Sequence, residues 1–381
     1  MNFSMRIRLQ TELFECKPNQ RIGWIIMKKS IDKEMLISSK GLYSSVIERK
    51  IFFIILAAII LSLLFIVDVM TGPAWIPIKE VISTILFPGS SDHKTYIIVW
   101  IMRLPVATMA VVVGASLGMA GAEMQTILDN PLASPYTLGI SSAASFGAAL
   151  GIVAGSGILP IAENIIVPVN AFIFAFLSSI IIYFIAKVKN GATETIVLAG
   201  ITFVFLFNSL VSLLQYLAKE NELQSIVFWM FGSLIKATWP KVAIVSAVLV
   251  IVIPFLILDA WKLTALRLGD NKARSLGVNV ERLRLKVLII ISIVTAVAVC
   301  FVGTIGFIGL VAPHLARTFV GEDQRFFMPF SALIGAVLLS FASVTSKLII
   351  PGTIFPIGIV TALIGIPFLI SIILTKKRLY W

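Results

Sequence analysis

The chain has 381 residues, of which 59% are hydrophobic and 13% are charged, and its mean hydropathy is +1.02. A soluble globular domain carries about twice that share of charged residues. The formal net charge of +12 would point to nucleic acid if the protein were soluble. In a membrane protein it follows instead from the excess of Lys and Arg in cytoplasmic loops. Composition therefore predicts a membrane protein with no nucleic-acid partner.

The N-terminal residues 1–50 are polar and basic, and continuous apolar sequence begins at Ile51. So long a polar stretch is unlike a secretory signal. We therefore expect two parts, a cytoplasmic, poorly ordered extension (residues 1–50) and a transmembrane domain (residues 51–381). If translation instead begins at Met27 or Met35, residues 1–26 are not part of the mature protein.

Ten apolar runs follow, each close to the roughly 20 residues that a helix needs to cross a hydrocarbon core. Because they are continuously apolar, they lack the alternation of barrel strands and are expected to be helices. The fold class is thus an all-α, polytopic membrane protein. The expected spans are residues 51–69, 105–125, 138–158, 167–186, 195–218, 241–260, 285–303, 306–320, 327–346 and 354–375.

Basic residues orient these spans. With both termini in the cytoplasm, all but seven of the 31 Lys and Arg residues lie inside, as the positive-inside rule requires. The seven on the outer side are Lys79, Lys94, Arg103, Lys219, Lys236, Lys241 and Lys347. The expected topology is therefore N-in and C-in.

Two spans are unusual in composition. The second contains Gly114, Gly118 and Gly121, and small residues at this spacing let helices approach closely in a bilayer. The eighth, Gly306–Val320, is short and contains Pro313. Because short, broken segments in corresponding halves of a transporter often mark a repeat, we interpret the regions around these two spans as a pair of internal repeats.

Few polar groups fall inside the spans. We interpret Glu123 as an interface-facing group at the end of the second span, with a proton relay as the less favoured alternative. We expect Asp68, at the outer end of the first span, to reach water. Asn208 and Gln215 lie two helical turns apart and therefore share a face. They are expected either to make interhelical hydrogen bonds or to line a solute path.

Catalytic chemistry is not indicated. The chain lacks the GxxxxGK[ST] phosphate loop. His93 and His314 stand apart from any cluster of cysteines or carboxylates, and Cys16 and Cys300 have no metal-ligand spacing. We predict no catalytic residue, no metal site and no cofactor.

One long basic loop, Lys262–Arg284, interrupts the spans on the cytoplasmic side. A loop of this charge, with glycines that permit sharp turns, is suited to docking a soluble partner. On the outer side, Arg103 and Lys347 run against the usual charge bias. They are expected either to reach toward lipid headgroups or to attract an acidic partner.

The motifs IMRLP (Ile101–Pro105), DNPLASPYTLGISSAA (Asp129–Ala144), LRLGDNKARSLGVNVERLR, GFIGLVAPHLAR (Gly306–Arg317) with GEDQRFFMP (Gly321–Pro329), and FPIGIVTALIGIPFLI (Phe355–Ile370) occur in this order. With them, residues 51–381 resemble the FecCD-type permeases of ABC importers for iron–siderophores, haem and cobalamin.

The resemblance implies a type II ABC importer permease of ten helices per subunit in a bacterial cytoplasmic membrane, working by alternating access. It also implies two cytoplasmic ATP-binding subunits, an external solute-binding protein or lipoprotein, and a second permease subunit, identical or paralogous. Iron–siderophore complexes are the expected substrate, and haem and cobalamin are the alternatives. The less favoured functions are an ion-coupled secondary transporter, which would need acids at mid-membrane depth, and a non-transporting scaffold or receptor.

The resemblance also assigns roles to residues. Arg103 and Lys347 are expected to dock the binding protein, although Val106 stands where many members have a second arginine. The inner gate of the family lies near the start of the fifth span, which here corresponds to Ala192, Thr193, Glu194 and Thr195. Contact with the ATPase is expected from Leu268, Gly269, Asp270, Ala273, Arg274, Leu276, Gly277 and Val278. Gly277 is expected to end the short helix of this loop.

Overall fold

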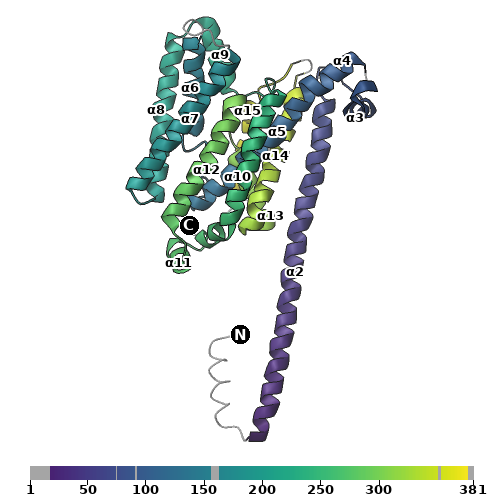
Figure 1. Cartoon of the computed structure of the whole chain (residues 1–381), viewed down its shortest axis with the longest axis vertical. Coiled ribbons are helices and arrows are strands. Elements are labelled where there is room, and N and C mark those ends of the chain that lie inside the picture. Colours follow the sequence, from purple (N-terminus) through teal and green to yellow (C-terminus); the bar gives the residue numbers. More distant parts are fainter. Residues whose placement is uncertain (1–17, 74, 91, 156–162, 351–352, 376–381) are drawn as a thin grey trace. The chain divides into compact units, whose positions relative to one another are not determined.

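The computed structural model describes residues 18–73, 75–90, 92–155, 163–350 and 353–375. Within these ranges the secondary structure is entirely helical (Figure 1). The elements are α2 (Pro18–Met70), α3 (Ile78–Leu86), η1 (Pro88–Ser90), α4 (His93–Tyr96), η2 (Ile97–Arg103), α5 (Leu104–Ile127), α6 (Ile140–Gly155), α7 (Glu163–Val188), α8 (Thr193–Leu217), α9 (Glu220–Met230), α10 (Trp239–Leu266), α11 (Asp270–Ser275), α12 (Val280–Val302), α13 (Ile308–Val320), α14 (Gln324–Leu348) and α15 (Ile357–Thr375).

The chain divides into two compact units, residues 1–53 and residues 54–381. In the first unit, helix α2 begins at Pro18, and the guanidinium of Arg49 lies 5.6 Å from the ring centroid of Phe53. Residues 1–17 of the predicted extension lie outside the described residues. The division of the chain into a cytoplasmic extension and a transmembrane domain stays a prediction.

Each of the ten predicted spans coincides with a helix, which confirms the all-helical, polytopic fold class. Among the described residues, seven helices are long and apolar enough to cross a membrane. The other three apolar helices, Ile140–Gly155, Ile308–Val320 and Ile357–Ser371, are shorter. A short helix can be accommodated where it packs against longer neighbours, because protein then surrounds its ends.

The elements between the first and second spans were not predicted. Helix α3 is short and amphipathic and buries Val81 and Thr84. The second span begins before its predicted start, since helix continues from His93 through the π-helical segment η2 into α5. Helix α9 was also missed, because it is short and its first turn is polar. At its start the backbone N–H of Lys219 donates to Glu222 Oε2 at 3.0 Å. A search for long apolar runs does not detect such helices.

Helix α5 lies at the centre of the second unit and packs against α10, α12, α13 and α14. Its predicted close approach is confirmed, since Gly114 and Gly335 face each other at the crossing of α5 and α14, where a Cβ on either would overlap the other's carbonyl oxygen. A Cβ on Gly121 would likewise overlap the carbonyl oxygen of Gly309 of α13. Tight backbone packing of this kind replaces the hydrophobic effect as the source of helix association in a bilayer.

The expectation for Glu123 was wrong. Its side chain is fully buried in α5 rather than directed toward the interface, and neither carboxylate oxygen has a hydrogen-bond partner within the part of the chain that the structure describes. The helix that carries it is enclosed by neighbours on several sides, so its position near a helix end does not place it in water. Inserting an ionisable side chain into a membrane costs about 2.5–3.5 kcal/mol of free energy on insertion scales. A buried carboxyl such as that of Glu123 is therefore a candidate for a functional test by mutation.

Candidate functional site

The loop between α10 and α12 folds around one short helix, α11. Gly269 precedes it with φ of 95°, and Gly277 follows it with φ of 84°. The N–H of Gly277 donates to the carbonyl of Arg274 at 2.9 Å, and the N–H of Val278 donates to that of Ala273 at 3.0 Å. This pair of bonds is the Schellman arrangement, which requires a left-handed residue and favours glycine there. Gly277 therefore ends the helix, as predicted.

The loop presents an apolar and basic surface to solvent. The side chains of Leu268 and Leu276, at the two ends of α11, are 56% and 55% exposed. Arg274 is also exposed and lies 3.5 Å from Glu281. Ala273 and Val278 are buried and anchor the opposite side of the short helix. Two exposed leucines beside basic side chains suit contact with another protein better than contact with water.

Arg284 connects this loop to the helix bundle. Its side chain is 5% exposed, and its guanidinium donates to the carbonyl of Ile127 at 2.6 Å and to that of Gly191 at 3.0 Å. A third contact, 3.1 Å long, joins it to Asp270 at the start of α11. One side chain thus holds the end of α5, the turn between α7 and α8, and α11. Arg284 therefore contacts both α11 and the turn that precedes the predicted gate residues.

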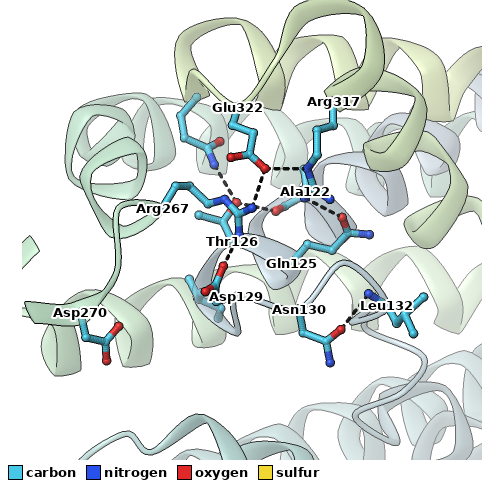
Figure 2. A network of polar contacts seen from close by, with 12 residues as sticks. Ala122, Gln125, Thr126, Asp129, Asn130, Leu132, Arg267, Asp270, Arg317 and Glu322 are labelled. Carbon is cyan, nitrogen blue, oxygen red and sulfur yellow. Dashed lines mark hydrogen bonds and ion pairs between the residues drawn. The ribbon is translucent and has the colours of Figure 1, made fainter. Parts of the chain in front are cut away.

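Arg267 makes a second connection at the other end of the loop (Figure 2). It lies 2.5 Å from Asp129, just after α5, and 2.5 Å from Glu322, in the loop between α13 and α14. Arg317 of α13 shares Glu322 Oε1 at 3.0 Å and donates to Gln125 of α5 at 3.1 Å. We call these five residues the ionic network. It joins the end of α5, the end of α13 and the loop between α13 and α14 to the first residue after α10.

Further polar contacts reinforce the same end of the bundle. Asp259 of α10 is buried and lies 2.7 Å from Lys262 and 2.5 Å from Lys286 of α12. Gln324, the first residue of α14, donates from its side chain to Thr126 at 2.7 Å and from its backbone to Thr264 at 3.1 Å. Because a buried charge is stable only when paired, these contacts fix how the helix ends meet.

The sequence did not single out the members of the ionic network. Asp129, Arg317 and Glu322 appear only as letters of the family motifs, Gln125 only as a residue of the second span, and Arg267 only as a charge of the basic loop. Arg284, which lies outside the network, was likewise only a charge of that loop. The two carboxylates that contact Arg267, those of Asp129 and Glu322, lie 138 and 55 residues away from it in the sequence. The available signal was the recurrence of charged residues at the predicted ends of different spans, which meet when the spans pack side by side.

The predicted gate residues begin helix α8. Ala192 is its N-cap, and Thr193, Glu194 and Thr195 form the first turn, where an acidic side chain interacts favourably with the helix dipole. Of the predicted pathway residues, Asn208 is exposed on α8, whereas Gln215 is partly buried and contacts the sulfur of Met230 at 3.7 Å. Their roles stay predictions.

At the other end of the bundle, the structure corrects the environment expected for Asp68. Asp68 was expected to reach water, but it is fully buried and accepts hydrogen bonds from Lys347 at 2.8 Å and Ser343 at 2.9 Å. Lys347 and Arg103 are also buried, and Arg103 donates to the carbonyls of Val69 and Met70.

These two cations therefore stabilise the end of α2 in this conformation instead of lying exposed on the surface. The binding-protein docking predicted for Arg103 and Lys347 stays untested. Val106, the departure from the family pattern, lines a cavity together with these two residues.

Comparison with known proteins matches residues 59–375 to the model of the FecCD transport family. An ABC transporter permease protein of Methanocaldococcus jannaschii is 36% identical, over 88% of this chain and 98% of its own length. The hemin transport system permease protein HmuU of Yersinia pestis is 36% identical, over 74% of this chain and 84% of its own. The Fe(3+)-citrate import system permease protein YfmE of Bacillus subtilis is 33% identical, over 87% and 97%.

A solved structure described as an inward-facing conformation of a metal-chelate type ABC transporter has the same fold. It superposes with a TM-score of 0.74 at 27% identity and covers 84% of this chain and 98% of its own. Named relatives thus include permeases for hemin and for an iron chelate.

Proposed function

Because the chain belongs to the FecCD transport family and is an ABC importer permease, we propose that it moves iron–siderophore complexes across the cytoplasmic membrane by alternating access. Haem and cobalamin are the alternative substrates within this proposal. The permease works as a dimer, with an identical or paralogous second subunit. It receives its substrate from an extracytoplasmic solute-binding protein.

The observation that carries the mechanism is the attachment of α11 to the bundle. Leu268 and Leu276 offer exposed apolar contacts to a cytoplasmic ATP-binding subunit. Each of the two permease subunits binds one such ATP-binding subunit. When that subunit closes on ATP, it displaces α11. Arg284 then transmits the displacement to the end of α5 and to the turn before α8. The ionic network transmits it to the loop between α13 and α14.

Differential binding is required for this coupling. A partner shifts a conformational equilibrium only by the difference in its affinity for the two states. The ATPase must therefore hold α11 differently with and without nucleotide. In this mechanism the inner gate at Ala192–Thr195 opens and closes as the turn before it moves, and Gly191 provides the link because its carbonyl accepts directly from Arg284.

Uptake of labelled chelates tests the proposed substrate class. A strain that lacks this chain is compared with the same strain after complementation, using iron complexes of catecholate, hydroxamate and citrate type, with haem and cobalamin as further substrates. We expect loss of one class of iron–siderophore and its recovery on complementation. Loss of haem or cobalamin uptake alone would contradict the siderophore proposal, and the family assignment would then hold for a different cargo.

A further inference from the structure

A cavity of about 820 Å³ lies at the ends of α10 and α12 opposite to the ionic network. Helix α9, the connection from α9 to α10, the start of α10 and the end of α12 contribute to its lining. Figure 1 shows α9 and α11 at opposite ends of the bundle. Sites for small molecules enclose about 300–1,000 Å³, so the cavity is large enough for a substrate. We call it the outer vestibule.

Two lysines give the outer vestibule its charge. Lys236 lies in the connection before α10, and Lys241 lies in the first turn of α10. The Nζ of Lys241 donates to the backbone carbonyl of Lys236 at 2.8 Å, so this ammonium is held at the turn that carries the other lysine. Neither lysine forms an ion pair within the described part of the chain, and the lining residues include no Asp or Glu.

The remaining walls combine aromatic and polar side chains. Phe228 is 57% exposed and Trp229 is partly buried, and both line the vestibule on α9. Gln224 and Ser225, one turn earlier on α9, add side-chain hydrogen-bond donors. Aromatic rings provide flat apolar surface on which planar ligand groups pack.

We propose that the outer vestibule binds an anionic iron(III) chelate with planar or aromatic ligand groups as it enters the permease. This inference rests on the proposed function and narrows its substrate class. Two uncompensated cations in a cleft with low-dielectric walls concentrate anions locally and accelerate their binding. The two lysines attract the negative charge of the chelate, while Phe228 and Trp229 pack against its ligand rings.

The alternative partner for Lys236 and Lys241 is an acidic side chain of the solute-binding protein. The vestibule favours the chelate because it is a walled cavity with aromatic sides, whereas a salt bridge to a protein needs neither. By contrast Lys347, also on the outer side, already has Asp68 as its counter-charge.

Binding to the full-length chain in lipid nanodiscs tests the proposal. Iron(III) complexes quench tryptophan fluorescence, and Trp229 lies in the vestibule wall. The probes are a tris-catecholate iron(III) complex, which is anionic, and a tris-hydroxamate iron(III) complex, whose coordination centre is neutral. We expect the anionic complex to quench tryptophan fluorescence saturably. Most of this quenching should be lost in Trp229→Phe.

The lysine variants test whether Lys236 and Lys241 attract the anionic complex. The double variant Lys236→Gln, Lys241→Gln should raise the Kd of the anionic complex about tenfold at low salt, and by less as ionic strength increases, since exposed charges are screened. Lys219→Gln is the matched control, because this lysine is 86% exposed, immediately precedes α9 and does not line the cavity. The neutral complex should bind equally to all variants.

Three results would overturn the inference: no saturable quenching, an unchanged Kd in the double variant, or an equal loss for both complexes. Docking of the binding protein instead of the chelate would leave quenching intact in the double variant and weaken only uptake in cells. Because quenching does not depend on transport, a failure of the proposed function would show separately, as absence of chelate uptake by cells with the unaltered chain.

Discussion

Replacing Arg284 with methionine should detach the end of the Lys262–Arg284 loop, which contains α11, from α5 and from the turn before α8. Methionine keeps the length and apolar stem of arginine but donates no hydrogen bond. The change leaves the buried carbonyls of Ile127 and Gly191 without their donor, and each unsatisfied buried group costs about 1–3 kcal/mol. Asp270 is 45% exposed, so water solvates its unpaired carboxylate and this contact adds little.

The expected sum is about 3 kcal/mol for holding the end of the loop at Arg284 against α5 and against the turn before α8. Since about 1.4 kcal/mol corresponds to a factor of ten in an equilibrium constant, local opening of the loop should become roughly a hundred times more frequent. Hydrogen exchange reports such opening at individual amides. The amides of Gly277 and Val278, which close α11, are the positions to follow.

Arg282→Met provides the matched control. Arg282 is exposed, and its backbone N–H donates to Asn279 Oδ1 at 3.0 Å, a hydrogen bond that does not depend on the Arg282 side chain. Exchange at α11 should therefore accelerate in Arg284→Met and stay at the level of the unaltered chain in Arg282→Met. Equal protection in both variants would refute the reasoning that Arg284 holds the loop.

Two further predictions concern charged groups of the bundle. In a double-mutant cycle of Arg267→Ala and Glu322→Ala, the effects on loop opening should be non-additive by about 1 kcal/mol, because contacting residues of one network couple. Simple additivity of the two effects would argue against the ionic network. Glu123→Gln should leave ATP-driven uptake intact, since a neutral amide suits its buried site. If uptake in this variant is abolished, and uptake by the unaltered chain survives deletion of the ATPase partner, ion-coupled transport would be favoured instead.

The positions of the long helices were predictable because lipid imposes a simple requirement. A span must be apolar over a fixed length, and the glycines at its packing face are visible as a pattern. Gly114 and Gly121 were therefore identified as contact residues, and their close packing is confirmed. Gly277 was identified as a helix end because few other residues adopt a left-handed backbone.

Burial of charged side chains was not predictable from position along a span. Asp68 and Glu123 both lie near helix ends, and both are fully buried because neighbouring helices cover those ends. The partner of Asp68 is Lys347, 279 residues away. Pairing at such separation depends on which helices pack together, and one sequence does not contain that information in any local pattern.

The most direct test of the account is whether α11 couples ATP hydrolysis to transport. Arg274→Glu reverses an exposed charge beside the two leucines, and Gly277→Pro is incompatible with φ of 84°. Arg325→Glu, an exposed charge reversal outside the loop, is the control. Chelate uptake is measured alongside the amount of permease in the membrane.

Uptake should fall sharply in Arg274→Glu and Gly277→Pro while the permease remains in the membrane, and it should persist in Arg325→Glu. Normal uptake with either loop variant would contradict the coupling role of α11.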